Sequence, residues 1–296
     1  MVITDKKNDA WISVIDESIN ADVVRSMNLF MQCSPQAFSA ALLDTDRNKF
    51  VSILDFRFPY PLGISDLTEK FLEIIDRLKK LLYNGNDSVV LSYCGYNNTL
   101  IPDAFFDPGK LDLIFYANHA SMYDDIGEEK LLFDNLRRIS ARNVYAVPKK
   151  LYDFFSSYYA NISIFHGATP LIEGLLSLHK NTEDKVVTVN VQSGYFEMVV
   201  NQGGDLIFYN RFSYQTVEDF LYYVVFVYEQ LGLNPETQIL YMAGAAEKNS
   251  ALVNLAVKYI RYVQFVQRPS FAYYSYGFDE VAPHYHFSLY NQFLCV

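Results

Sequence analysis

Two stretches of the chain share one pattern, in which three short β-strands follow one another and a helix comes next. In the later stretch, Val186–Phe212, apolar runs are separated by the polar clusters Gln192-Ser193-Gly194 and Asn201–Asp205. β-rich runs bounded by Gly, Asn and Asp are the strongest hairpin signal that a single sequence offers. We therefore predict an antiparallel three-stranded meander with a tight turn at each polar cluster.

The earlier stretch, Leu29–Phe58, repeats this pattern, with predicted turns at residues 34–36 and 45–48. A helix is predicted after each meander, capped by Ser65 in the first case and by Thr216 in the second. Both residues have a side-chain oxygen that can accept from a helix N-terminus, and acidic residues and a one-sided apolar pattern follow them. The two stretches are therefore interpreted as copies of one unit.

Beyond the meanders, both halves continue with alternating strands and helices. The second half is predicted to contain a strand, a helix, a strand and a final helix, at Gln238–Met242, Ala246–Tyr259, Val263–Val266 and Pro283–Leu294. The first half has the same order at Asn143–Val147, Pro148–Tyr158, Ile162–Phe165 and Thr169–His179. The order matches only if residues 86–142 are an insertion, with strands at Val89–Tyr93, Thr99–Ile101 and Leu111–Tyr116 and a helix near Glu128–Ser140.

This arrangement predicts an α/β protein of two duplicated domains, with mixed five-stranded sheets flanked by helices. Residues 1–180 form the first domain, with the insertion at about 86–142, and residues 181–296 form the second. Two unrelated α/β domains are the alternative interpretation of the same pattern.

Composition narrows the functional classes. The chain has 296 residues, 51% of them hydrophobic and 16% aromatic, which excludes a disordered protein and provides for roughly two domains. The net charge of -10 makes a nucleic-acid partner a poor fit. No apolar run approaches the ~18 residues of a membrane span, and the N-terminal sequence lacks the apolar core of a signal peptide, so no membrane insertion is expected. Cys33, Cys94 and Cys295 are an odd, widely spaced set, which favours reduced thiols in the cytoplasm.

No residue pattern points to a catalytic or metal site. His284 and His286 lie close together but have no third ligand at a legible spacing, so a metal site is not predicted. His166-Gly167 lies between a predicted strand and a predicted helix, where an anion could bind the helix N-terminus. The alternative is an ordinary turn in which Thr169 caps the helix.

The order of elements resembles the actin-like ATPase superfamily, and in detail the branch that contains the pilus protein PilM and the cell-division protein FtsA. Val186–Phe212 is similar to the second phosphate hairpin of that branch, and LYMAGAA (240–246) is similar to its adenosine segment. VYAVPKKLYDFF and ANISIFHGATPLIEGLL are similar to its first-domain strand-helix-strand-helix. The overall resemblance is strongest to an uncharacterised Bacteroidetes family with this fold, and it covers nearly the whole chain from Leu29 on.

The resemblance implies ribonuclease H-like domains with a nucleotide cleft between them. In ATP-hydrolysing relatives, the backbone N–H groups of two hairpin turns hold the phosphates, and an Asp at the end of each first strand orients hydrated Mg²⁺. A Gly pair lets the backbone approach the nucleoside. This chain departs from that pattern, because both Asp positions carry amides and the Gly pair is half retained. The positions implied as degenerate cleft residues are Gln32, Ser34, Asn190, Gln192, Ser193, Gly194, Ala243 and Gly244.

These departures favour a non-hydrolysing member of the superfamily. A neutral amide adds no negative charge for Mg²⁺, and Pro35 removes an N–H that a phosphate would bind. We therefore expect a pseudo-ATPase scaffold or adaptor, with no catalytic residue and no tightly held cofactor. The alternative is a nucleotide-binding switch or kinase-like enzyme whose modified cleft binds a nucleotide without firmly held metal.

A protein partner is expected, although the sequence does not identify it or the oligomeric state. The chain has 24 Tyr and 23 Phe, more than a core needs, and Tyr is enriched at recognition surfaces. Phe271–Phe278, with the sequence FAYYSYGF, and the insertion are the candidate contact regions. Aromatic filling around two sheets is the alternative explanation of this composition.

Overall fold

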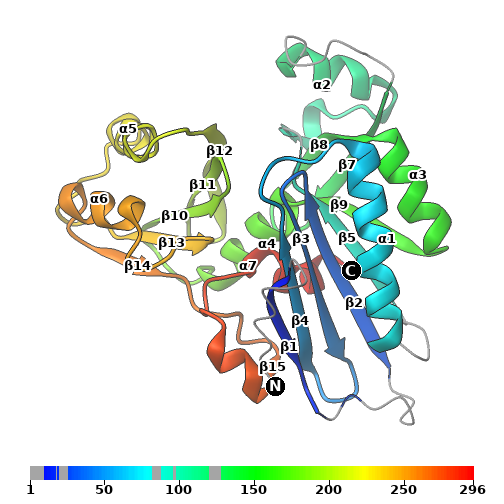
Figure 1. The fold of residues 1–296 in the computed structure, drawn as a ribbon. Helices are drawn as coiled ribbons and strands as arrows, with labels where there is room; N and C mark the ends of the chain where they lie inside the picture. The colour runs from blue at the N-terminus through cyan, green and yellow to red at the C-terminus, as the bar shows by residue number, and fades with distance from the viewer. Residues whose placement is uncertain (1–9, 18, 20–25, 82–87, 96–97, 120–127) are drawn as a thin grey trace. The chain divides into compact units, whose positions relative to one another are not determined.

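The computed structural model describes residues 10–17, 19, 26–81, 88–95, 98–119 and 128–296, and it divides into two compact units (Figure 1). Unit 1 contains Met1–Pro170, Ser270–Val281 and Leu289–Val296, whereas unit 2 contains Leu171–Pro269 and Ala282–Ser288. The chain thus returns to unit 1 near its C-terminus. This division differs from the predicted one in two respects. Its first boundary follows Pro170 and not residue 180, and two C-terminal segments that were predicted in the second domain lie with unit 1.

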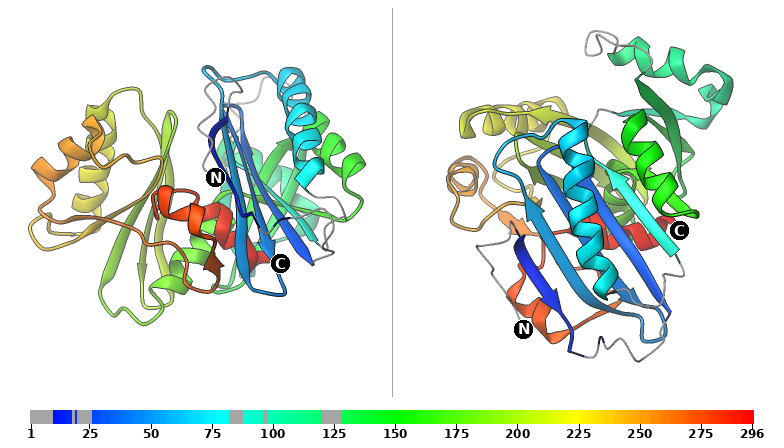
Figure 2. Two further views of the ribbon diagram at one scale, coloured as in Figure 1. Left: turned by 60° about the horizontal axis from the view of Figure 1, so that its bottom comes forward. Right: turned by 45° about the vertical axis from the view of Figure 1, so that its right-hand side comes forward.

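Unit 1 is organised around a seven-stranded sheet of order β1-β4-β3-β2-β5-β9, with β15 paired to β4 (Figure 2). Its β2, β3 and β4 form the predicted antiparallel meander, and β5 and β9 continue the sheet in parallel. The strands are β1 Ala10–Ile15, β2 Met27–Ser34, β3 Ala37–Asp44, β4 Lys49–Arg57, β5 Ser88–Tyr93, β9 Ile162–His166 and β15 Tyr273–Tyr274.

Two helices, α1 (Ile64–Leu81) and α3 (Lys149–Tyr158), pack on one face of this sheet. Their apolar faces meet where the ring centroids of Phe71 and Phe155 lie 5.5 Å apart, and Phe71 also contacts Phe38 of β3. Burying such apolar surface is the main favourable contribution to folding. Both helices were predicted, α3 from Pro148, which directly precedes it.

A separate three-stranded sheet of order β6-β8-β7 belongs to unit 1, with β6 Asn98–Pro102, β7 Glu129–Leu136 and β8 Ala141–Pro148. Helix α2, Leu111–His119, packs on it through Phe115. Two predictions were wrong here: Leu111–Tyr116 is helical rather than a strand, and the helix expected near Glu128–Ser140 is β7. The charged sequence EEKLLFDNLRR favours a helix locally, but pairing with β8 along all of β7 decides the outcome.

The insertion was also delimited wrongly. Val89–Tyr93, which was predicted inside it, forms β5 and pairs with β2 in the main sheet. Asn143–Val147, which was predicted as the fourth strand of the first domain, lies in β8 of the small sheet. Apolar runs of five residues look alike in sequence whichever sheet they join, so the pattern could not separate them. Residues 86–87, 96–97 and 120–127 of the predicted insertion lie outside the described residues.

Unit 2 contains a five-stranded sheet of order β12-β11-β10-β13-β14. Its strands are β10 Lys185–Gln192, β11 Tyr195–Gln202, β12 Asp205–Ser213, β13 Leu240–Gly244 and β14 Val263–Phe265. Helices α5 (Val217–Gln230) and α6 (Ala251–Tyr259) cover one face, with Phe220, Val224 and Val253 in the core. Thr216 caps α5 as predicted, in a capping box with Asp219.

Both units therefore repeat one sheet order, in which the third, second, first, fourth and fifth strands of each copy are neighbours. In unit 1 these are β4, β3, β2, β5 and β9, and in unit 2 they are β12, β11, β10, β13 and β14. The hydrogen bond from the N–H of Cys94 to the carbonyl of Cys33 has an equivalent from Ala245 to Val191, and each spans 2.8 Å. This matched register supports the duplication.

The remaining helices join and complete the units. Helix α4, Ala168–Leu178, follows β9, and the chain passes from unit 1 to unit 2 within it. The predicted final helix, Pro283–Leu294, is shorter and divided, with α7 at Phe287–Asn291 and a 3₁₀ turn at Gln292–Cys295. His286 has a φ of 59°, so the backbone just before α7 is not helical. Within the described ranges, no helix is long and apolar enough to cross a membrane.

Candidate functional site

The hairpin of β10 and β11 positions the first group of candidate residues in unit 2. Asn190 of β10 lies opposite Glu197 of β11, and both side chains are buried. The Asn190 Nδ2 donates to Glu197 Oε2 at 2.9 Å, and the hydroxyl of Tyr209 donates to Oε1 at 3.0 Å. Burial raises the pKa of the Glu197 carboxyl above its ordinary value, while Arg211 and the two hydrogen bonds oppose that rise.

Gly244, at the end of β13, lies directly beside this hairpin. It pairs with Val191, and a Cβ at Gly244 would lie 2.3 Å from the Val191 carbonyl oxygen and 2.6 Å from Asn190 Oδ1. Its φ of 73° is a second reason for glycine. The structure thus brings six predicted residues to one end of the unit 2 sheet: Asn190, Gln192, Ser193, Gly194, Ala243 and Gly244.

The C-terminal segment of unit 2 covers Gly244. The Gly244 N–H donates to the carbonyl oxygen of His284 at 3.0 Å. His284 is buried, its Nε2 lies 2.7 Å from the Ala246 carbonyl oxygen, and its ring centroid is 4.4 Å from that of Phe265. The Gly244 N–H, which the resemblance places beside a nucleoside, is therefore bonded within the chain itself.

The equivalent end of the unit 1 sheet holds the other two predicted residues, Gln32 and Ser34. Gln32 pairs with Ser39 of β3, as Asn190 pairs with Glu197. Ser39 Oγ donates to Asp55 Oδ1 at 2.6 Å, and the other oxygen of Asp55 lies 3.3 Å from Nε of Arg57. Among the described residues, Gln32 Oε1 is buried without a hydrogen-bond partner.

The unit 1 turn already uses its own backbone donors. Ser34 Oγ accepts from the N–H of Gln36 at 3.3 Å and from the N–H of Ala37 at 3.0 Å. Pro35, which lies between Ser34 and Gln36, has no N–H. A phosphate would find few free donors at this turn.

A residue of the C-terminal segment also packs against β2 and β5 of unit 1. Gln292 is fully buried, and its Nε2 donates to the Met31 carbonyl at 2.7 Å and lies 2.6 Å from Ser92 Oγ. Tyr93 is the counterpart of Gly244 in unit 2. Tyr93 pairs with Cys33, the residue after Gln32, and Gly244 pairs with Val191, the residue after Asn190. The sequence predicted neither the contacts of Gln292 nor those of His284, which was weighed only as a metal ligand, because these contacts join distant parts of the chain and no motif marks them.

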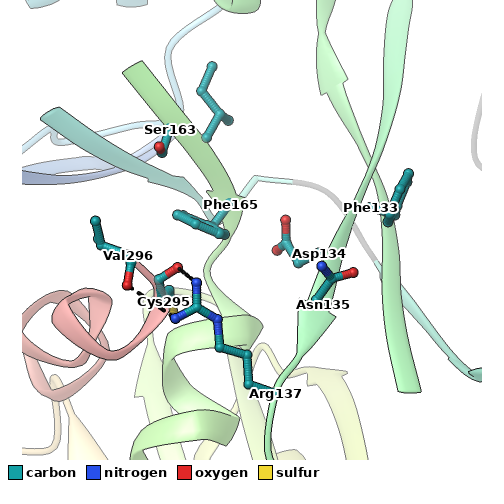
Figure 3. Close-up of a pocket in the computed structure, with 9 residues that line it drawn as sticks. Phe133, Asp134, Asn135, Arg137, Ser163, Phe165, Cys295 and Val296 are labelled. Atoms are coloured by element: carbon teal, nitrogen blue, oxygen red, sulfur yellow. Dashed lines mark hydrogen bonds between the residues drawn. The ribbon is translucent and has the colours of Figure 1, made fainter. Parts of the chain in front are cut away.

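A second polar cluster lies in unit 1 beside a cavity of about 450 Å³. Figure 3 shows Asp134 from β7, Arg137 from the turn after it, Ser163 and Phe165 from β9, and Cys295 and Val296 around this cavity. Arg137 donates to the carbonyl oxygens of Cys295 at 2.9 Å and Val296 at 3.1 Å. Asp134 is buried and approaches the N-terminus of α4, so the site predicted at His166-Gly167 receives a carboxyl from the chain itself.

The candidate residues do not form a metal site. In the parts of the chain that the structure describes, no group of three or more His, Cys, Asp or Glu side chains is arranged to hold a metal ion. His284 is engaged with Ala246, and neither Asn190 nor Gln32 offers a charged oxygen.

Comparison with solved structures supports the fold. A Bacteroides thetaiotaomicron protein with an actin-like ATPase fold and unknown function has a TM-score of 0.75 and 20% identity, covering 92% of this chain and 97% of its own. A chain of the PilM–PilN type IV pilus biogenesis complex has a TM-score of 0.58 and 11% identity, covering 92% and 98%. The predicted actin-like fold and the likeness to PilM are thus confirmed.

No curated protein is significantly similar to the chain. Residues 16–263 match the family described as protein of unknown function DUF3822, and this match spans most of the chain. The chain, which repeats one sheet order in its two units, therefore belongs to the DUF3822 family.

Proposed function

We propose that this protein is a non-hydrolysing, actin-like scaffold or adaptor that acts through a protein partner. The observation that carries the proposal is the Asn190 side chain, whose Nδ2 donates to Glu197 at 2.9 Å. An ATP-hydrolysing relative needs a charged oxygen at this position for hydrated Mg²⁺. Here the side chain is neutral and is held by a carboxylate of the neighbouring strand.

The rest of the site supports the same conclusion. Gln32 is neutral at the matching position of unit 1, and Ser34 Oγ already accepts two N–H groups of the turn. The Gly244 N–H, at the position assigned to the nucleoside, is bonded to His284. The metal-orienting charges, the unit 1 turn donors and the Gly244 N–H are therefore not offered to a nucleotide.

A partner is supported by exposed apolar side chains and by one structural neighbour. Phe105 and Leu113 near and in α2 and Tyr273 and Tyr276 in the FAYYSYGF segment are exposed, whereas Tyr274 of that segment packs on Phe50. The neighbour from the PilM–PilN complex was solved with a partner protein. Because Cys33, Cys94 and Cys295 are all free and buried, a cytoplasmic location is part of the proposal.

A nucleotide-dependent switch is the second candidate, favoured by the turn of unit 2. Ser193 and Gly194 are exposed at this turn, and nothing lies within 4 Å of a Cβ built on Gly194. The turn could therefore still receive an anionic group from outside.

Thermal unfolding with Mg–ATP, Mg–ADP and nucleotide plus chelator distinguishes the two candidates. The scaffold proposal predicts no rise in the unfolding midpoint at about 5 mM nucleotide. A ligand with a dissociation constant a hundredfold below its concentration would stabilise the native state by about 2.7 kcal/mol, a shift of several degrees. A saturable shift that is abolished by Ser193→Trp would support the switch and contradict the scaffold.

The partner is tested by affinity capture with surface variants. We expect a protein bound by the wild-type chain to be lost with Phe105→Glu and Leu113→Glu, or with Tyr273→Glu and Tyr276→Glu. Val257→Lys, at an exposed position of α6, is the matched control. Capture of no partner, or equal loss with the control, would contradict the adaptor proposal.

A further inference from the structure

The buried carboxyl group of Asp134 joins several elements of unit 1. Its Oδ2 accepts from the backbone N–H of His166 at 2.9 Å and from the hydroxyl of Thr169 at 2.6 Å. Its Oδ1 lies 2.9 Å from the hydroxyl of Tyr145. The side chain thus connects β7 to β8, to β9 and to the start of α4.

Other polar side chains extend this cluster. Asn143 Nδ2 donates to Thr169 Oγ1 at 2.9 Å, and Asn98 Nδ2 donates to Asn143 Oδ1 at 2.7 Å. The Thr169 hydroxyl can therefore receive one hydrogen from Asn143 and give its own to Asp134. All three strands of the small sheet and the start of α4 belong to one network.

The number of hydrogens in this network identifies the protonation state of Asp134. The Tyr145 hydroxyl has one hydrogen, yet two oxygens lie 2.9 Å from it, Asp134 Oδ1 and the carbonyl oxygen of Ile164. A carbonyl can only accept, so the hydroxyl satisfies Ile164 only by donating to it. With the Tyr145 hydrogen on Ile164, the 2.9 Å contact with Asp134 Oδ1 is a hydrogen bond only if Asp134, as the neutral acid, donates it.

We propose that Asp134 is a proton-operated switch, which as a neutral acid fastens the β6-β8-β7 sheet to β9 and to the start of α4, and which weakens this attachment on losing its proton. In the ionised state the Tyr145 hydroxyl has two competing acceptors and only one hydrogen. Either the carboxylate or the Ile164 carbonyl then loses its partner, and a buried unpaired acceptor is unfavourable.

The electrostatics of the site agree with this proton count. Burial raises the pKa of Asp134 to about 7, against the opposing hydrogen bonds of Thr169, His166 and Tyr145. The folded-state pKa is then above the unfolded value of 3.8, so the native state binds the proton more tightly. Stability from this group is complete below the unfolded pKa and is lost as the pH rises toward about 7.

Several titratable or charged groups face Asp134. Tyr145 of β8 has its own pKa raised by burial and by Asp134, so it stays a neutral hydroxyl. His166 of β9 accepts the Ala168 N–H at Nδ1, which requires that nitrogen to be unprotonated. Arg137, in the turn after β7, is bonded to Cys295 and Val296. Glu173 lies in α4, one turn beyond Thr169. His166 is the imidazole next to this carboxyl, so the test must separate the two groups.

The cavity gives the proton a route to solvent. Asp134 is among the residues that line it, although the side chain is only 4% exposed (Figure 3). Protonation can therefore follow the external pH without unfolding.

Two measurements on the full chain test the proposal. In the wild-type protein, the ¹³C resonance of the Asp134 carboxyl should titrate with a midpoint near 7. The unfolding equilibrium constant should rise by tens-fold between about pH 5 and about pH 8, as expected for one group with this shift. Asp134→Asn can present its oxygen to Thr169 and His166 and its amide hydrogen to Tyr145, so it imitates the neutral acid and should abolish most of that rise.

Two further variants identify the titrating group. His166→Gln retains an acceptor for Ala168, so the pH dependence should persist if Asp134 is responsible. Asp112→Asn, at an exposed carboxyl of α2, should behave as the wild type. A carboxyl resonance that shows ionised Asp134 at pH 5, or a pH dependence that survives Asp134→Asn and disappears with His166→Gln, would overturn the proposal. If Asp134→Asn does not fold, the wild-type resonance decides the question alone.

Discussion

The two repeats have the same strand order but different polar side chains at matching positions. In unit 1 the row across β2, β3 and β4 is Gln32, Ser39 and Asp55, and Arg57 balances the carboxylate. In unit 2 the first two positions are Asn190 and Glu197, and the hydroxyl of Tyr209 on the third strand donates to Glu197. Each repeat has a buried carboxyl on another strand of its meander, Asp55 on the third strand in unit 1 and Glu197 on the second in unit 2. Each is bonded to its own chain, so the repeats share topology without sharing a binding chemistry.

The same comparison holds at the end of the fourth strand. Unit 2 has Gly244, whose backbone lies against β10, whereas unit 1 has the buried side chain of Tyr93 at the matching register. A glycine that admits close backbone contact in one repeat is thus replaced by a large side chain in the other. Substitutions at paired positions should therefore have unequal effects.

The largest effect is expected for Gly244→Ala. The added Cβ would overlap the Val191 carbonyl, and the φ of 73° is strained for alanine, so we expect a loss of about 4 kcal/mol in the free energy of unfolding. Gly194→Ala is the control, since its φ is 77° but nothing lies within 4 Å, and it should cost about 1 kcal/mol. Denaturant titration measures both; equal losses would contradict the close-approach explanation.

Asn190→Asp should be next, with a cost of about 3 kcal/mol above neutral pH. The new carboxyl would face Glu197 across the 2.9 Å contact, and the pair could remain buried only by holding a proton. The pair's folded-state pKa is then raised, so the loss should be small near pH 5 and grow as the pH rises. Chemical denaturation at both pH values measures this, and a pH-independent loss would show that the carboxyls do not meet.

Ser34→Ala is expected to have a smaller effect, about 1 kcal/mol, because the N–H groups of Gln36 and Ala37 lose an acceptor at a partly exposed turn. Ser193→Ala, at the matching turn of unit 2, should change stability by less than about 0.5 kcal/mol. Thermal unfolding of the two variants side by side would sharpen the contrast between the turns. A larger loss from Ser193→Ala would reverse it.

No gain in ATP hydrolysis is expected from placing carboxylates at both of the positions that the resemblance implies for metal. The double variant Gln32→Asp and Asn190→Asp should not hydrolyse Mg–ATP, because Ser34, Pro35 and His284 still block the remaining contacts. Phosphate release at a temperature where the variant is folded is the readout. Hydrolysis above the wild-type background would show that charge alone had been missing.

The features that the sequence predicted correctly are local ones. The meanders, the Thr216 cap and the helix after Pro148 follow from turn residues, capping and periodicity within a few positions. The mistakes at α2 and β7 arose where tertiary pairing overrides local preference, and the insertion was misplaced because short apolar strands do not reveal their sheet. The site positions came from the resemblance, whereas His284, Gln292 and the Asp134 network depend on partners that are distant in the chain. Glu197 lies near its partners in sequence, but the hairpin pattern does not show which side chains are bonded across the strands.

The last part of the chain has a consequence for how the protein is made. Residues 270–281 and 289–296 belong to unit 1, and 282–288 belong to unit 2, so each unit includes a piece of the C-terminal stretch. Gln292, for example, bonds to Met31 across 261 positions of sequence. During synthesis, which delivers the N-terminal part first, unit 1 lacks residues 270–281 and 289–296 until the segments of unit 2 that precede them have been made. The two units should therefore complete their folding together, and not one domain at a time.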